Sequence, residues 1–300
     1  MKKAIALFLT LLYLITVSAA GPALAADQLN IVASFYPIYI LAMNVFDGID
    51  EVSLSCMTAP DTGCLHDYQL LASDMITLSR ADALLICGAG MEAYLPGVTA
   101  QFPSLQIIDC SEGIDLIPSD DEDEGEFNAH TWLDVQNAVC IVHTIAEAAC
   151  KICPDAADTI CANADGYISR LNALDTEMKE SLAPVAGKSI VTFHEAFPYF
   201  ARAYGLEIVA VINEEHEDTI APSALAAVID AVREAGNPPL FTEPQYSAQA
   251  AITVSMETGA KIFELDPLVT GEMQKNAYEE GMRRNTEALL HAFEETGETP

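Results

Sequence analysis

The chain has 300 residues, 51% of them hydrophobic, and a formal net charge of −32 at pH 7. This length and composition allow a large buried core and predict one large domain or two ordinary ones. The negative charge argues against nucleic acid or anionic lipid as a partner, and it concentrates cations near the surface.

The N-terminal segment predicts export. Lys2 and Lys3 precede an apolar run that ends in the small-residue sequence ALA at positions 23–25. We therefore expect a signal peptide, residues 1–26, that is cleaved near Ala25-Ala26, and a periplasmic or extracellular protein. A retained membrane anchor is the alternative, because the apolar run is only marginally long enough to span a bilayer. No cysteine stands at the cleavage site to accept a lipid.

Short apolar runs rich in β-branched residues alternate with helical patterns along the rest of the chain. Their continuous apolarity predicts parallel strands that are buried on both faces by helices. The runs are residues 29–35, 52–56, 83–88 and 105–109 in the first half and 188–193, 207–212, 239–243 and 260–266 in the second.

Between the two sets of runs, good helix formers fill the stretch from Pro154 to Pro184 and predict one long helix. We predict an α/β fold with two lobes, each with a mainly parallel four-stranded sheet flanked by helices. The expected N-terminal lobe is 27–153, the linker helix 154–183 and the C-terminal lobe 184–300.

Eight cysteines in an exported chain allow disulfides. Two of them, Cys87 and Cys140, lie in apolar runs and are expected to be unbridged thiols that pack like small apolar residues. The plausible bridges join Cys56 to Cys64, and Cys150 to Cys153 or Cys161.

Four side chains are candidate metal ligands because of where they stand relative to the predicted strands. Ligands of open α/β sheets bind beyond the carboxyl ends of strands, and such positions are occupied by His66, His130, His194 and Asp266. Three imidazoles and a carboxylate suit four-coordinate zinc, whereas more carboxylates would favour manganese. Taken singly, each histidine is more often a hydrogen-bonded structural residue.

The stretches "GCLHDYQLLASD", "NAHTWLD", "FHEAFPYFARAYGL" and "EPQYSAQAAITVSMETGAKIFELDPL" together resemble the metal-binding receptors of bacterial zinc and manganese ABC importers. The resemblance runs from about Leu29 to the end of the chain. It implies two lobes bridged by one long helix, with the metal in the cleft between them. It also implies Zn²⁺ as the cargo, with Mn²⁺ as the alternative, because manganese-type members carry glutamate where this chain has His194.

By the same resemblance, His66, His130 and His194 match the ligand histidines and Asp266 matches the carboxylate position, which water or another carboxylate replaces in some zinc members. The partners implied are an ABC permease and its ATPase, with the receptor itself a monomer. Leu65 stands where the family commonly has proline or glutamate, and the missing glutamate puts a fourth protein ligand from that loop in doubt.

An acidic run, residues 119–126, directly precedes the segment that carries His130. One hypothesis is that it raises the local cation concentration and speeds metal capture; the other is that it is a tolerated surface insertion. Trp132 is expected to pack the start of the following helix against the lobe rather than to touch metal.

The expected function is capture of a zinc ion, partial closing of the cleft and delivery to a permease, without enzymatic activity. Because protons compete for imidazoles, affinity should fall below about pH 6.5. Alternatives are a manganese receptor, a surface adhesin, or a zinc-dependent hydrolase with Glu195 as its base. The chain has no H-E-x-x-H sequence to support a hydrolase.

Overall fold

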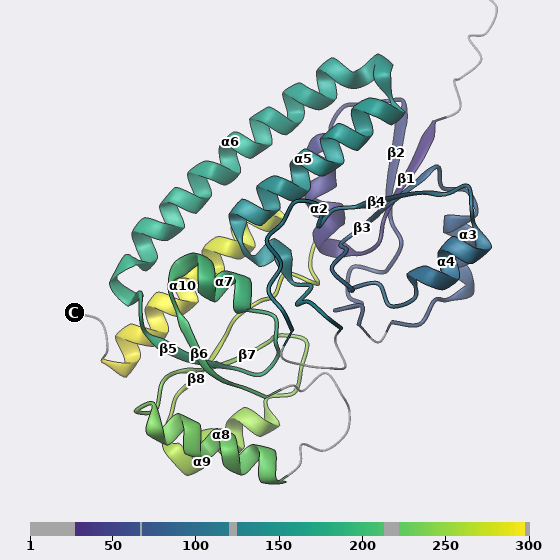
Figure 1. Ribbon diagram of the computed structural model, residues 1–300. Helices are drawn as coiled ribbons and strands as arrows, with labels where there is room; N and C mark the ends of the chain where they lie inside the picture. Colours follow the sequence, from purple (N-terminus) through teal and green to yellow (C-terminus); the bar gives the residue numbers. More distant parts are fainter. Residues whose placement is uncertain (1–27, 67, 120–124, 213–221, 298–300) are drawn as a thin grey trace, which may run out of the picture.

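Two parallel sheets, one in each half of the chain, organise the computed structural model, which describes residues 28–66, 68–119, 125–212 and 222–297 (Figure 1). The first sheet has the strand order β2-β1-β3-β4 and the second the order β6-β5-β7-β8. The predicted two-lobed α/β fold is confirmed, and the predicted signal peptide lies outside the described residues. The strands are β1 (Leu29–Ala33), β2 (Val52–Cys56), β3 (Ala83–Ile86), β4 (Gln106–Asp109), β5 (Ser189–Thr192), β6 (Glu207–Val211), β7 (Leu240–Thr242) and β8 (Ile262–Glu264).

Helices cover both faces of the first sheet, as the continuous apolarity of its strands requires. Successive side chains of a strand point to opposite faces. Ile31 and Ala33 of β1 belong to a core shared with α2 (Tyr36–Val45) and α5 (Val135–Ile152). Val32 joins a second cluster with residues of α3 (Ala72–Leu78) and α4 (Leu95–Gln101).

The second sheet repeats this arrangement. Val191 and Leu240 pack with residues of α8 (Pro222–Glu234) and α9 (Gln249–Thr258). On the other face, Ile190 and Phe241 join the core that contains residues of α7 (Pro198–Tyr204) and α10 (Ala277–Thr296). Helices therefore cover both faces of the second sheet as well.

One long helix, α6 (Ala157–Leu182), connects the two halves of the chain, where the sequence places a linker at 154–183. A 3₁₀ turn at Pro154–Ala156 precedes it and another at Ala183–Val185 follows it. α5 lies against α6 along much of its length, and Figure 1 shows this pair running beside both lobes. A single hydrophobic cluster contains residues of β1, α2, α5, α6, α7 and α10, so the two lobes share one core.

None of the expected disulfides is formed, although all eight cysteines lie within the described residues. The Cys56 thiol lies 4.0 Å from the Thr58 hydroxyl, and neither Cys56 nor Cys64 is in a disulfide. The Cys150 and Cys161 sulfurs lie 3.4 Å apart, which is a non-bonded contact between two thiols. Among the cysteines expected in the core, Cys87 is buried and Cys140 is partly exposed.

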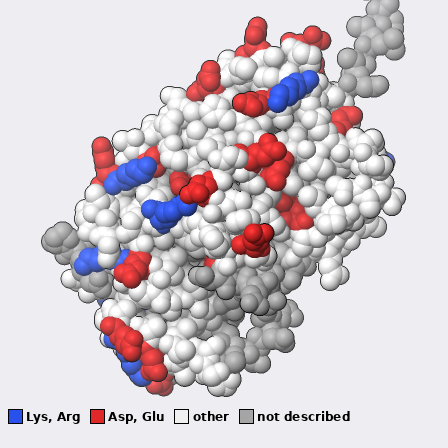
Figure 2. All heavy atoms as spheres, viewed as in Figure 1, with Lys and Arg blue, Asp and Glu red and all other residues white. Residues whose placement is uncertain are grey.

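The molecular surface is acidic, and Figure 2 shows carboxylates spread over one face with few basic side chains between them. Some of the basic groups are paired: Arg283 contacts Glu177 at 2.9 Å, and Lys179 contacts Asp175 at 2.8 Å. Within the described ranges, no helix combines the length and the apolarity that crossing a bilayer requires.

Candidate metal centre

His130 lies just before the 3₁₀ turn Thr131–Leu133 that leads into α5, and its side chain is fully buried. Asn128 orients it, because the Asn128 side-chain amide donates a 2.6 Å hydrogen bond to the Glu195 carbonyl. The Asn128 Oδ1 therefore faces His130, where it accepts from the backbone N–H at 3.0 Å and lies 3.3 Å from Nδ1. An amide oxygen only accepts, so Nδ1 carries the proton and Nε2 is the nitrogen that can bind a metal.

His194 follows β5, and it is also fully buried. Its Nδ1 lies 3.0 Å and 3.1 Å from the two carboxylate oxygens of Glu243, the residue that follows β7. The strands β5 and β7 are neighbours in the sheet, so their carboxyl ends bring these two side chains together. A carboxylate on Nδ1 fixes the tautomer that presents Nε2 to a metal and makes that nitrogen a stronger ligand.

His66 and Cys64 lie in the loop between β2 and α3, which belongs to the N-terminal lobe. Both are partly exposed, and they line a pocket of about 260 Å³ together with Gln245 and Tyr246 of the C-terminal lobe. This loop is therefore the side of the centre that faces an open pocket.

The three histidines converge from loops of both lobes. Ring centroids of His66 and His130 lie 5.3 Å apart, and those of His130 and His194 lie 4.7 Å apart. Possible ligand atoms of His130, His194 and Cys64 all lie within 4.8 Å of one another. Separations of this size allow one ion to contact all three donor atoms.

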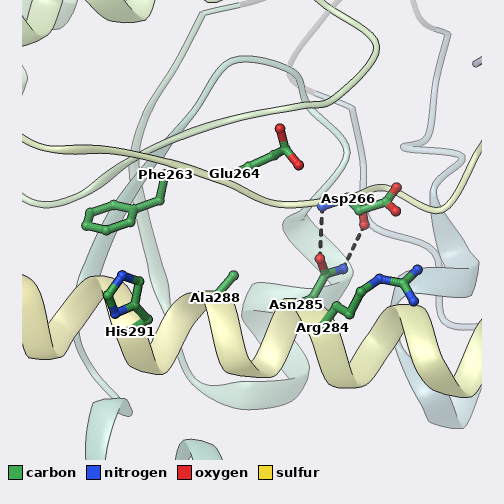
Figure 3. Close-up of a pocket in the computed structure, with 7 residues that line it drawn as sticks. All are labelled: Phe263, Glu264, Asp266, Arg284, Asn285, Ala288 and His291. Atoms are coloured by element: carbon green, nitrogen blue, oxygen red, sulfur yellow. Dashed lines mark hydrogen bonds between the residues drawn. The ribbon is translucent and has the colours of Figure 1, made fainter.

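Asp266 and His66 both lie outside this close group of Cys64, His130 and His194 donors. The Asp266 carboxylate accepts a 2.8 Å hydrogen bond from the Leu268 N–H, and the backbone N–H and carbonyl of Asp266 both pair with the Asn285 side chain (Figure 3). It lines a pocket of about 290 Å³ in which Arg284 extends from α10. Burial is the main cause that raises the Asp266 pKa. Its role as a ligand stays a prediction.

Trp132 packs as the sequence predicts. Its ring lies edge-on to Phe35, at 5.4 Å between centroids, and its indole N–H donates a 2.7 Å hydrogen bond to the Pro267 carbonyl. The start of α5 is thereby held against the loop that follows Asp266. Most of the acidic run lies outside the described residues; at its base, Pro118 and Phe127 form an antiparallel bridge.

Sequence reasoning missed three residues that shape this centre: Asn128, Glu243 and Cys64. Glu243 stands at a strand end, so the rule that found His194 also applies to it. Cys64 was assigned to a bridge with Cys56, and its position two residues before His66 was the signal that it belongs with the histidines.

A family model described as "Zinc-uptake complex component A periplasmic" matches residues 31–292 of this chain. The chain is also similar to the zinc-binding lipoprotein AdcA of Streptococcus pneumoniae, with 29% identity over 314 residues that cover 99% of this chain and 62% of AdcA. It thus spans less than two thirds of AdcA. The manganese-binding lipoprotein MntA of Halalkalibacterium halodurans is 29% identical over 201 residues, which cover 66% of each chain.

Among solved structures, the solute-binding protein FpvC of Pseudomonas aeruginosa in complex with Mn²⁺ has a TM-score of 0.81 and 26% identity to this chain. That match covers 90% of this chain and 100% of FpvC. The Zn(II)-bound ZnuA-like domain of S. pneumoniae AdcA has a TM-score of 0.74 and 28% identity, over 89% of this chain and 99% of that domain.

Proposed function

The chain belongs to the family of periplasmic zinc-uptake component A, and we propose from this membership that it is an exported receptor that binds zinc and delivers it to an ABC importer. The observation that carries the proposal is the convergence of His66, His130 and His194 from both lobes. A ligand site at the meeting of two lobes places the cargo where movement of the loops that line it can admit or release the ion.

Zinc is the cargo that the donor set favours. His130 and His194 are buried imidazoles, each with an acceptor at Nδ1, so both present Nε2 as a neutral nitrogen ligand. Such nitrogen-rich sites suit zinc, which also binds a given set of donors more tightly than manganese does. The AdcA relatives, whose names describe zinc binding, support the same assignment.

A manganese receptor is the second candidate, and two observations favour it. MntA is named for manganese binding, and FpvC was solved with Mn²⁺. Manganese prefers oxygen ligands, so this candidate requires Asp266 to coordinate the ion. That would require the carboxylate to exchange its contact with the Leu268 N–H for the metal.

Binding rather than catalysis is the role of this family, whose members are solute receptors. A catalytic zinc keeps an open position for water or substrate, whereas a receptor site is closed by protein ligands. Burial of His130 and His194 supports a site that encloses its ion. A zinc hydrolase would need Glu195 as its general base. In this structure the Glu195 carboxylate accepts a 3.2 Å hydrogen bond from the Ser119 hydroxyl.

The proposals that the protein is exported and that it delivers its ion to an importer rest on the family, not on the metal centre. A cleaved signal peptide at residues 1–26 would place the receptor outside the cytoplasm, where a permease and its ATPase import the ion. Relatives named as lipoproteins support an exported location. We propose that the mature protein acts as a monomer.

The test is zinc binding by the mature protein and two histidine variants. His194→Ala removes a proposed ligand, whereas His143→Ala alters an exposed histidine on α5 and is the matched control. We expect one zinc per chain by elemental analysis in the wild-type protein and in His143→Ala, and loss of stoichiometric zinc in His194→Ala. Equal zinc content in both variants would refute the proposed site.

Competition between the two ions separates the two candidates. The zinc-free protein is titrated with each ion in competition with a chelator of known affinity. We expect zinc to bind more tightly than manganese, and we expect the ratio of the two affinities to be the same in Asp266→Asn. A selective loss of manganese binding in Asp266→Asn, with manganese as the tighter ligand of the wild type, would favour the manganese receptor.

A further inference from the structure

The Cys64 thiol lies beside the buried histidines His130 and His194. Its Sγ lies 3.4 Å from the Nε2 of His130, and it belongs to the group of possible ligand atoms within 4.8 Å of one another. We infer that Cys64 is a metal ligand of this receptor and that its thiolate, rather than the Asp266 carboxylate, completes the zinc site. This inference rests on the proposed function, because it assigns a further donor to the same centre.

Tetrahedral zinc geometry accounts for the distance. With Zn–S of about 2.3 Å and Zn–N of about 2.0–2.1 Å, a sulfur and a nitrogen bound to one tetrahedral zinc lie about 3.6 Å apart. The 3.4 Å between Cys64 Sγ and His130 Nε2 is close to that value. The two atoms are thus already at the spacing of a shared ion.

Cys64 belongs to the close group of donor atoms, whereas Asp266 does not. Cys64 is on the same loop as His66, two residues earlier, so the loop that delivers one ligand delivers the other. Asp266 accepts a hydrogen bond from the backbone of its own loop and lies in a pocket with Arg284. The carboxylate would have to give up its hydrogen bond with the Leu268 N–H to reach an ion.

Coordination by Cys64 changes which ions the site accepts. On binding, the Sγ–H bond breaks, the proton passes to the solvent, and the sulfur electron pair forms the bond to zinc. Thiolate is a soft donor that suits zinc and is a poor ligand for manganese, which prefers carboxylate, carbonyl and water. A site of three imidazoles and one thiolate would therefore select zinc over manganese more strongly than three imidazoles and a carboxylate.

A weak hydrogen bond between the Cys64 thiol and His130 would give the same 3.4 Å separation in the metal-free protein. The two possibilities differ once an ion is bound. A ligating sulfur forms a bond to the metal, whereas a hydrogen-bonding thiol does not. The experiment must therefore detect sulfur bound to the ion itself.

Cobalt(II) is the probe, because a thiolate bound to it gives an intense charge-transfer band in the near ultraviolet that histidine and carboxylate ligands do not give. The reduced, zinc-free mature protein is titrated with Co²⁺, and the same titration is made with Cys64→Ser and with Cys56→Ser as the matched control. We expect the band in the wild type and in Cys56→Ser. Cys64→Ser should lose the band yet keep the weaker visible bands of histidine-bound cobalt.

Zinc affinity gives the second readout. Loss of partners that only orient ligands costs about 10–100-fold in metal affinity, so we expect Cys64→Ser to weaken zinc binding by more than about 100-fold. Its manganese affinity should change little, so the preference for zinc should narrow. Asp266→Asn should weaken zinc binding by less than Cys64→Ser does.

The outcomes distinguish a failure of the Cys64 assignment from a failure of the proposed receptor function. If the wild-type protein binds cobalt and zinc without the charge-transfer band, and Cys64→Ser keeps its zinc affinity, Cys64 is not a ligand but the receptor function stands. If the wild type binds neither ion, the proposed function fails and the role of Cys64 fails with it. Cys64→Ala repeats the test with a side chain that cannot coordinate.

Discussion

Glu243 orients His194 through a hydrogen bond to Nδ1 that is fully buried with the ring. Its removal would leave the ring able to rotate and to carry its proton on either nitrogen. In the proposed site this carboxylate would act on the metal through His194, and its effect can be measured apart from that of the proposed ligand.

We predict that Glu243→Ala weakens zinc binding by about 10–100-fold. Glu243→Gln should recover part of the loss, because the amide oxygen still accepts from Nδ1. Chelator competition with the purified variants measures both, and Glu207→Ala, which alters an exposed carboxylate of β6, is the control. Zinc affinity in Glu243→Ala equal to that of Glu207→Ala would show that His194 needs no such partner.

Glu92 is a buried carboxyl group, and burial raises its pKa from 4.5 to about 7. Its oxygens accept hydrogen bonds from the backbone N–H groups of Cys87 and Gly88, at 2.7 Å and 3.1 Å, and these bonds only partly offset the cost of burying the charge. The folded protein therefore holds the Glu92 proton at pH values where the unfolded chain has lost it.

The sign of the pH dependence follows from that pKa. Stability from Glu92 is fully present below pH 4.5 and is lost as pH rises toward 7, since the folded state binds the extra proton in that window. We predict that the free energy of unfolding falls by about 3 kcal/mol between pH 4.5 and pH 8 on this account. Urea unfolding of the zinc-free protein across this range, with Glu92→Gln beside it, measures the contribution.

Glu92→Gln cannot titrate, so its stability should depend less steeply on pH than that of the wild type, even if the variant is less stable overall. Glu207→Gln, at an exposed position, should keep the wild-type slope. Parallel pH profiles for the wild type and Glu92→Gln would contradict the assignment.

The elements of the fold were predictable because their signals are local. Apolar runs of β-branched residues gave all the strands that the structure describes, since a strand buried on both faces needs no polar alternation. The linker helix ends within three residues of its predicted bounds at both ends, because Pro154 and Pro184 mark its limits. The pairing of α5 with α6 was not predicted, because it depends on packing between distant residues.

The candidate site was predictable only in part. Strand-end positions pointed to His66, His130 and His194, which the structure brings together, although their role as ligands stays a proposal. The same rule named Asp266, which, like His66, lies outside the close group and which accepts a hydrogen bond from the Leu268 N–H. Cys64 was misassigned because the sequence gives the number of cysteines but not their distances. The sequence does not show which side chains of the two lobes lie close together, because that depends on how the lobes pack in the folded protein.

The α5–α6 pair carries two thiols at its connected end. Cys150 near the end of α5 and Cys161 in the first turns of α6 have sulfurs 3.4 Å apart, and Cys161 is exposed. In an oxidising compartment such a pair can lose two electrons and two protons to an oxidised glutathione and form a disulfide. The bond would close a short loop around the turn at Pro154–Ala156.

We predict that mild oxidation of the zinc-loaded protein with glutathione disulfide forms the Cys150–Cys161 bond and raises the free energy of unfolding by about 3 kcal/mol. Peptide mapping identifies the bridge, and denaturant unfolding with and without a reductant measures its effect. Cys161→Ser should abolish both changes, whereas Cys153→Ser should keep them. A bridge that instead includes Cys153 would contradict the prediction.

Many contacts join the two lobes, and a protein whose lobes rotate about a hinge would have to break them. α10 packs against α2 of the first lobe, against α6 and against β8 of the second lobe. Further bonds cross the same boundary: the Tyr36 hydroxyl donates to the Glu272 carbonyl at 2.9 Å, and the Gly271 N–H donates to the Pro60 carbonyl at 3.1 Å. A large rotation of one lobe would break these contacts and divide the shared core.

Zinc capture should therefore proceed by local movement of loops rather than by closure of whole lobes. We predict that the radius of gyration of the mature protein, about 18–19 Å for a compact chain of this size, is the same with and without zinc in small-angle X-ray scattering. Hydrogen exchange should instead slow on zinc binding in the loop that carries Cys64 and His66 and in the segment after β7, because these parts face the pocket. A smaller radius of gyration in the zinc-bound protein, with slowed exchange spread over both lobes, would contradict this prediction. It would show that the lobes close as rigid bodies and that the shared core rearranges when zinc binds.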